Sequence, residues 1–521
     1  MKRTDIARFL PAAVLLASGL ARGAGFEFPD DGAEALGRSG AFAAKADDGT
    51  AIYYNPSALA DQKGLNILVD SEFINNSVNF QRTDSLGTAI GPAVQNSGGT
   101  FIDPFVAVSY QILPRLTLAL GIYGPPADGR YQFPGETPPA FNSAGLSSPN
   151  GSCLIGFCPQ PGQTPGAYTS PPEGGPGPDP QKYNLISDNI FIAYPTLSVA
   201  WAPIDIIAVG VSAQMVYAST QISQATFDGA LFENGKHLTT DEVPIWDTIA
   251  NLNVSNSPVR EYTGILGVTI KPPVIPLRIG ASYRPGFSIV QNGTMTLDYS
   301  TVMQYGGGKP ATVTGKGTQQ AKDNSSGSGP VEFDLPMPGE FKSGVDWSFG
   351  GGSDLELDFD YTQWSQVGKI YTTPNFGVVA NGATTPLPAL TQLNDFQDTW
   401  ALRLGGDWKL PVPLVRLAVR AGLSYESSVY PSSGTIYPQL SFPNFQMYAG
   451  AVGLTAGLGP VDIVLAYSHV YEPTEDVRNA GTPMTQNVSA GSAAPPTVVV
   501  GNGNYTTSYD VVAAGVRIHF L

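Results

Sequence analysis

The eleven residues DLELDFDYTQW, at positions 354–364, constrain the fold more than any other stretch of this 521-residue chain. Apolar side chains occupy every second position from Leu355 to Tyr361, and every position between them is an acid. A period of two is typical of a β-strand, in which successive side chains point to opposite faces. One face of this strand must avoid water, and the other must stay hydrated or paired.

Three further segments, 277–284, 400–408 and 415–426, show the same alternation, with arginines on the polar face. In a soluble β-sandwich the charged faces would meet solvent and the apolar faces would form the core. In a membrane barrel the apolar faces would instead meet lipid. Alternation alone leaves both architectures open.

The lengths of the connections favour the barrel. Tight turns such as 113–115, 202–203 and 410–413 alternate with long polar or Pro/Gly-rich segments such as 223–259. This sorting, with an even number of strands, is typical of outer-membrane β-barrels, whereas a sandwich has no reason to sort its loops. The fourteen predicted strands are 64–82, 101–112, 115–124, 184–202, 204–222, 260–272, 274–298, 332–350, 352–365, 394–409, 411–427, 441–459, 460–472 and 506–520. The other long segments between strands are predicted at 125–183, 299–331, 366–393 and 473–505.

Composition agrees with a membrane location and excludes one class of partner. Charged residues make up 13% of the chain, about half the usual share of a soluble protein. The net charge of −16 argues against nucleic acid, because phosphates would be repelled. The three histidines are far apart in sequence, so neither a metal site nor a cofactor is predicted.

The N-terminus indicates export. Basic residues precede the apolar run FLPAAVLLASGL, and small residues stand at Ala21 and Gly23, where a signal peptidase would cut. We therefore predict a signal peptide at 1–23; the alternative is an uncleaved anchor. The segment 448–467 is apolar, but its glycines and Pro460 favour two strands over one membrane helix.

Two tryptophans provide a check on the barrel. Trp400 and Trp408 lie on the same apolar face, eight residues apart. At a tilt of about 40° this separation spans roughly 20 Å, close to the height of a lipid-facing band. Indoles favour the two edges of such a band.

Residues 24–63 do not fit the strand pattern and are predicted to form a small N-terminal plug, with the barrel at 64–521. Asn55 is a good N-cap and Pro56 suits the first helical position. The alternative is an ordinary helix start in a small domain. A 14-stranded barrel is wide enough to need a filling.

The segment AGFEF…ALGRSGAFAAKADDGTAIYYNPSAL resembles the N-terminal hatch of the FadL/TodX family of outer-membrane transporters. The family's acidic "ADD" corresponds to Ala46, Asp47 and Asp48, and its "NPA" to Asn55, Pro56 and Ser57. Similar stretches follow in order at 333–344, 361–366, 396–406 and 465–471. One departure is the end of the chain, Phe520-Leu521, where many outer-membrane barrels finish on an aromatic residue.

The resemblance implies a 14-stranded barrel with a hatch in the outer membrane of a Gram-negative bacterium. It also implies long-chain fatty acids or other hydrophobic molecules as ligands, with membrane lipid and the barrel-assembly machinery as partners. Ligand would be captured by outer loops, pass into the lumen and leave sideways through a break in the third strand. Gly121 and Gly124 are the candidates for that break; the alternative is that they are glycines of ordinary tight packing.

Candidate ligand groups come from the hairpin 394–427. If its turn centres between residues 411 and 412, Asp407 faces Arg416 and Arg403 faces Arg420. Two opposed arginines are unfavourable unless an anion lies between them. A fatty-acid carboxylate is one possible anion, and a network with the acids Glu356, Asp358 and Asp360 is the other. Arg284, on the polar face of 277–284, is a third candidate ligand group.

Three remaining features bear on function. Cys153 and Cys158 are predicted to form a disulfide in an oxidising compartment, with free thiols as the alternative. Ser468 and His469 are adjacent on a strand, so they point to opposite faces and make a poor catalytic pair for a barrel phospholipase. No catalytic residue is predicted, and the hatch argues against a general porin.

Overall fold

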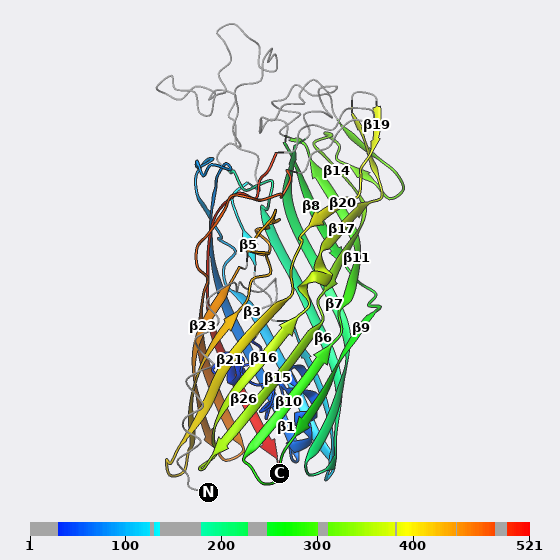
Figure 1. Ribbon diagram of the computed structural model, residues 1–521. Coiled ribbons are helices and arrows are strands. Elements are labelled where there is room, and N and C mark those ends of the chain that lie inside the picture. Colours follow the sequence, from blue (N-terminus) through cyan, green and yellow to red (C-terminus); the bar gives the residue numbers. More distant parts are fainter. Residues whose placement is uncertain are drawn as a thin grey trace.

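The computed structural model describes residues 30–125, 130–135, 179–227, 247–300, 311–380, 383–443, 445–484 and 498–520. These residues form a closed antiparallel β-barrel of 14 strands, as the sequence predicts, with short helices inside its lower half (Figure 1). The predicted signal peptide at 1–23 and the predicted Cys153–Cys158 disulfide lie outside the described residues.

The wall follows the order of the chain, and each strand pairs with the next. Strand β26 closes the barrel on β1 through a ladder from Leu65↔Phe520 to Arg82↔Gly503. The wall strands are β1 (Leu65–Arg82), β3 (Phe101–Leu113), β4 (Leu116–Tyr123), β6 (Ser187–Ile204), β7 (Ile207–Phe227), β9 (Glu261–Ile270), β10 (Leu277–Arg284), β15 (Glu340–Phe349), β16 (Ser353–Thr362), β21 (Thr399–Leu410), β22 (Arg416–Glu426), β23 (Met447–Leu458), β24 (Val461–Tyr471) and β26 (Gly503–Phe520).

Tight turns and long connections alternate around the rim, as predicted, although two turns lie elsewhere than expected. The second turn falls at 205–206, where Ile204 pairs with Ile207, and not at 202–203. The turn between β21 and β22 occupies 411–415. Sequence alone does not fix the length of a turn, so these boundaries shifted by a few residues.

Several segments predicted as loops contain strands, which is a correction to the sequence-based assignment. The segments 223–259, 299–331 and 366–393 all contribute strands to the long-loop end of the barrel. The upper-wall strands are β8 (Asp247–Ser255), β11 (Phe287–Asp298), β14 (Ser326–Met337), β17 (Lys369–Pro374) and β20 (Leu390–Leu393). Shorter strands are β2 (Val94–Gln95), β5 (Tyr131–Gln132), β12 (Thr312–Thr314), β13 (Gln319–Gln320), β18 (Gly377–Ala380), β19 (Ala383–Pro386) and β25 (Glu475–Val477).

The two longest predicted strands, 274–298 and 332–350, are each divided by a Pro-Gly pair. Pro285-Gly286 separates β10 from β11, and Pro338-Gly339 separates β14 from β15. The two interruptions face each other, because a Cβ atom on Gly286 would lie 3.1 Å from the backbone nitrogen of Gly339.

This paired interruption exchanges the two faces of the wall. Below it, Ser282 and Arg284 point inward and Tyr283 outward; above it, Ile289 points inward and Ser288 outward. A shift of one residue moves every later side chain to the opposite face. On these four strands the wall is therefore mostly apolar outside and polar inside below the interruption, and mostly polar outside and apolar inside above it.

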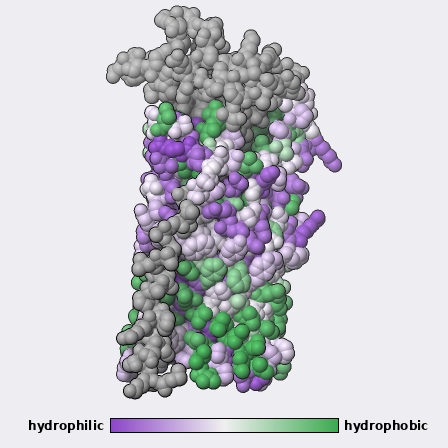
Figure 2. Space-filling model, viewed as in Figure 1, coloured by the Kyte–Doolittle hydropathy of each residue, from purple (hydrophilic) through white to green (hydrophobic). Residues whose placement is uncertain are grey.

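The surface shows this change directly. Apolar residues gather on the lower part of the visible face, and polar residues cover much of the part above (Figure 2). On β16, Leu357 is 55% exposed whereas Asp358 is 1% exposed, so the apolar side chains of 354–364 face outward and its acids face inward, as predicted. Trp400 and Trp408 both lie on the outward face of β21. No helix among the described residues is long and apolar enough to cross a membrane.

The lower lumen is filled by residues 30–62, called the hatch below. Its helices are α1 (Ala33–Leu36), α2 (Ala51–Tyr54) and the 3-10 helix η2 (Pro56–Asp61). The backbone of the hatch lies against the wall: a Cβ atom on Gly210 of β7 would come within 2.4 Å of the backbone at residues 56–57. Glycine is required there by close approach of two backbones. Another 3-10 helix, η5 (Trp364–Val367), lies between β16 and β17.

Candidate functional site: the lumen and its hatch

The acids of β16 bind the hatch. Arg38 donates from Nη1 to Asp354 at 2.5 Å and from Nη2 to Glu356 at 3.0 Å. Asp358 accepts the backbone N–H groups of Phe42 and Ala43 at 2.7 and 2.8 Å. The polar face of the opening stretch therefore meets a buried protein segment and not a water-filled pore.

The predicted pairing of the hairpin β21–β22 is wrong. Asp407 lies opposite Arg420, and Arg403 lies opposite Ser424. Leu410 pairs with Leu417, so the hairpin turns two residues later than assumed. The two arginines do not face each other, and the argument for an anion between them does not hold.

Each candidate arginine on this hairpin contacts acids of the wall and of the hatch. Arg403 binds Asp360 at 2.7 Å and, in the hatch, Asp30 at 3.2 Å. Arg420 binds Asp407 at 3.1 Å and Glu34 of the hatch at 3.3 Å. The two arginines therefore lie in a charge network, but of the three acids predicted for it only Asp360 contacts one of them. Glu356 and Asp358 bind the hatch instead.

Arg416, predicted to pair with Asp407, instead donates to Asp462 at 2.7 Å. Lys45 of the hatch occupies the other side of Asp407 and also binds Asp354 at 3.0 Å. The hatch thus supplies both acids and bases to one continuous network.

The predicted acidic pair of the hatch is divided between two environments. Asp48 is buried and accepts the Thr50 N–H and hydroxyl at 2.9 and 2.6 Å. Asp47 is exposed and lines a cavity of about 350 Å³ at the short-turn end of the barrel, whose lining is both charged and apolar. Arg517 of β26 reaches Asp48 at 4.0 Å and also binds Glu34.

The Asn55-Pro56-Ser57 motif makes neutral contacts. Asn55 Oδ1 accepts the Ser57 N–H at 3.2 Å and its hydroxyl at 2.6 Å, which caps η2 as predicted. Asn55 Nδ2 donates to the Ala43 carbonyl at 2.9 Å, and the Ser57 and Thr269 hydroxyls lie 2.7 Å apart. The hatch is therefore held by ion pairs towards β16, β21, β22 and β26 and, through Asp61, towards Lys271 and Arg278 at the short-turn end of β9 and β10. The contacts of Asn55 and Ser57 with β9 are neutral.

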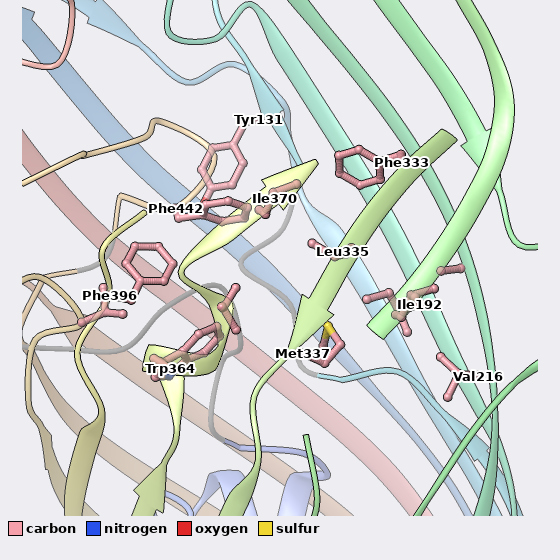
Figure 3. Close-up of a cluster of buried hydrophobic side chains, with 14 of the residues drawn as sticks. Tyr131, Ile192, Val216, Phe333, Leu335, Met337, Trp364, Ile370, Phe396 and Phe442 are labelled. Atoms are coloured by element: carbon pink, nitrogen blue, oxygen red, sulfur yellow. The ribbon is translucent and has the colours of Figure 1, made fainter. Parts of the chain in front are cut away.

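Above the hatch the lumen is lined by buried apolar side chains from elements that are far apart in sequence (Figure 3). This group is called the lumen cluster below. Sequence alternation missed it, because its strands carry their apolar side chains on the inner face. Its labelled members are Tyr131, Ile192, Val216, Phe333, Leu335, Met337, Trp364, Ile370, Phe396 and Phe442.

Arg284, the third candidate, lies where the polar lower lumen meets the lumen cluster. Its Nη2 donates to Glu340 at 2.7 Å, and Lys342 binds the same carboxylate at 3.3 Å. The guanidinium lies 5.8 Å from the ring centres of both Tyr194 and Phe287. Lys342 was not predicted, although its position opposite Ser282 on the inner face follows from alternation.

The third wall strand is short. Strand β4 ends at Tyr123, which pairs with Tyr194 of β6, and among the described residues the next pair on this side of β6 is Asp188 with Tyr131 of β5. Gly124 follows the last residue of β4, and its N–H donates to Asp103. Gly121 instead packs inside, where a Cβ atom would come within 2.3 Å of Ile52 of the hatch.

Ser468 is buried and His469 is exposed, so the two point to opposite faces, as predicted. His469 Nδ1 lies 2.9 Å from Asp510 on the outer surface. This arrangement provides no nucleophile–base pair at these positions.

A closed barrel with an apolar outer band, short turns at one end and a plugged lumen defines an outer-membrane transport protein. A family model described as "Outer membrane protein transport protein (OMPP1/FadL/TodX)" matches residues 191–497. The chain belongs to this family, whose members are transport channels for hydrophobic compounds in the outer membrane.

Solved structures share the whole fold. A FadL homologue of Pseudomonas aeruginosa matches with a TM-score of 0.63 and 15% identity, over 96% of this chain and 100% of that chain. The toluene transporter TbuX of Ralstonia pickettii matches with a TM-score of 0.57 and 16% identity, over 94% and 99%. The CymD monoaromatic hydrocarbon channel matches with a TM-score of 0.57 and 14% identity, over 95% and 99%.

A curated relative, a putative outer membrane protein of Neisseria meningitidis serogroup B, is 29% identical over 106 residues. The matched stretch covers 19% of this chain and 22% of that protein, so the chain spans about a fifth of the relative's length.

Proposed function

We propose that the protein carries long-chain fatty acids or similar hydrophobic molecules passively across the outer membrane, and that it is not an enzyme. The carrying observation is the exchange of faces at the two Pro-Gly pairs. On these strands it turns the apolar side chains towards the inside of the barrel above the hatch. An apolar molecule gains by moving from water into such a lining.

The route follows from this layout. Outer loops capture the molecule, the lumen cluster binds it, and the hatch blocks the direct path to the periplasm. The hatch's ion pairs are buried, and breaking a buried pair leaves an uncompensated charge. A sideways exit near the end of β4, with rearrangement of the neutral side of the hatch, avoids breaking them.

Arg284 and Lys342 favour a carboxylate-bearing ligand. Two cations share Glu340 at the floor of the lumen cluster, so an apolar tail can lie among aromatic side chains while its acid reaches the cations. Charge-assisted hydrogen bonds to a carboxylate would fix the orientation of the molecule. We assign ligand binding to Arg284, and hatch anchoring to Arg403 and Arg420.

A hydrocarbon or aromatic-compound channel is the second candidate. Two of the structural neighbours are described as a monoaromatic hydrocarbon channel and a toluene transporter. The many aromatic rings of the lumen cluster suit such ligands equally well, because apolar pockets discriminate weakly among apolar molecules.

The test uses the full chain, expressed in outer membranes that lack transporters of this family. Uptake of radiolabelled oleate and of toluene is compared with that of an empty-vector control, and swelling of proteoliposomes in sugars reports on porin activity. We expect oleate uptake above the control without sugar swelling. Toluene uptake alone would favour the second candidate, and sugar swelling alone would contradict both.

A further inference from the structure

A second apolar site lies on the outside of the barrel. A groove of about 400 Å³ crosses β4, β6, β7 and β9 on the lipid-facing part of the wall. Its borders are strongly exposed: Leu120 is 62% and Tyr262 is 66% accessible. The groove is thus open to the surroundings of the barrel and separate from the lumen.

The register explains why a groove forms here. Its floor is a single cross-strand row, Gly121↔Thr196↔Gln214↔Thr263, whose side chains point inward or are absent. Leu120 and Leu197 pair on one side of this row, while Met215 and Tyr262 pair on the other. The outward neighbour of Leu197 is Ala213, whose methyl group leaves the groove unfilled.

The pairing of β6 with β7 has a gap directly beside this groove. Pairing between β6 and β7 stops at Ala193↔Tyr217 and resumes at Thr196↔Gln214. Pro195, which lies in the gap, has no N–H to donate to a neighbouring strand. Next to this gap, on the other side of β6, β4 ends at Tyr123.

Aromatic rings occupy the inner side of the same stretch of wall. Gln214 Nε2 donates to the Tyr123 hydroxyl at 2.6 Å. The Tyr123 ring stacks on Phe105 at 4.8 Å and meets the rings of Tyr53 and Tyr194 at 5.7 and 5.8 Å. Tyr123 and Tyr194 belong to the same continuous apolar core as the lumen cluster, so the wall alone separates that core from the groove.

We propose that this outer groove binds an extended alkyl chain and receives the transported molecule as it leaves the lumen between β6 and the end of β4. The inference rests on the proposed function and deepens it, because it locates the first site outside the lumen. The groove is lined by no charged residue, so it holds the tail and leaves the carboxylate to the lumen or the membrane surface. The Gln214–Tyr123 hydrogen bond is the contact that must open.

The test fills the groove from outside. Ala213→Trp places an indole between the two ridges without touching the lumen, and Trp is tolerated on a lipid-facing wall. The matched control is Ala514→Trp, because Ala514 is also an exposed, outward alanine but lies on β26, between Leu465 and Ser71. Oleate uptake, oleate binding to the detergent-solubilised protein and labelling by a diazirine palmitate are measured for both variants and the wild type.

We expect Ala213→Trp to lower uptake about tenfold, a factor typical of a small change in apolar fit. Binding in the lumen should remain, and Ala514→Trp should behave as the wild type. Diazirine palmitate should label β6 and β7 beside the groove more than β24 and β26, and excess oleate should compete.

If the wild type takes up oleate and Ala213→Trp takes it up equally well, the proposed role of the groove is overturned while the proposed function stands. Two labelling results would also overturn the role of the groove, because they would assign it to bulk lipid. One is uniform labelling of all lipid-facing strands; the other is labelling that is displaced by phospholipid but not by oleate. A wild-type chain without uptake of any hydrophobic probe would contradict the proposed function, and the groove's role with it.

Discussion

Asp407 and Arg420 lie directly opposite each other on β21 and β22, and Arg420 Nε donates to Asp407 at 3.1 Å. Arg420 also binds Glu34 of the hatch at 3.3 Å. A cross-strand pair of the barrel wall is therefore part of the plug's attachment. Because such pairs are desolvated, removing one partner destabilises the protein far more than removing one partner of an exposed ion pair.

Replacing Arg38 tests the charged side of this attachment. Arg38→Met leaves Asp354 and Glu356 buried without their shared cation, at a cost of about 3–5 kcal/mol. We expect the hatch to loosen and single-channel conductance in planar bilayers to rise. The control is Arg115→Met, since Arg115 pairs with Asp205 on the surface, where ion pairs contribute little. Equal conductance of both variants would show that Arg38 does not hold the hatch.

The neutral side is tested at Asn55. Asn55→Ala removes the cap of η2, a loss of about 1 kcal/mol, together with the hydrogen bond to the Ala43 carbonyl. We expect oleate uptake to fall while the amount of heat-modifiable, assembled barrel stays constant. Asn292→Ala, on the polar outer face of β11, serves as the control. Uptake that stays normal in assembled Asn55→Ala would argue against a role for this side of the hatch in transport.

Arg284 distinguishes acidic from neutral ligands. Hydrogen bonds to charged groups contribute roughly 1.5–3 kcal/mol, so Arg284→Met should weaken oleate binding about tenfold or more. Hexadecane binding should change little, because the alkane makes no use of charge. Both affinities are measured by displacement of a fluorescent probe. Arg403→Met, which removes a hatch contact, should affect both ligands alike; selective loss of oleate in that variant would reassign the carboxylate site to Arg403.

The lower barrel could be predicted from sequence because its strands alternate apolar residues facing outward with polar residues facing inward, as Leu357 and Asp358 do. Two features could not. The register of β21 and β22 depends on the turn at 411–415, and the alternation of the two strands does not indicate how long that turn is. The upper wall, including Phe333, carries its apolar residues inward, so its alternation looks like that of a soluble sheet. The sequence predicts β11 and the end of β14 only as continuations of lower-barrel strands, and β8, β17 and β20 fall in predicted loops. The Pro-Gly pairs at 285–286 and 338–339 were the available signal.

Phe333 and Glu332 test this exchange of faces, since they are neighbours on β14 with opposite orientations. Phe333 is 3% exposed in the lumen cluster, whereas Glu332 is exposed on the outer surface. Phe333→Asn puts an amide among apolar side chains, which is unfavourable without partners, and it removes a large aromatic surface from the ligand's path. We expect oleate affinity and uptake to fall about tenfold, as for a lost apolar contact, while Glu332→Gln leaves both unchanged. The opposite result, with loss in Glu332→Gln alone, would mean that the upper wall keeps the polarity of the lower barrel and that ligand does not pass through its apolar interior.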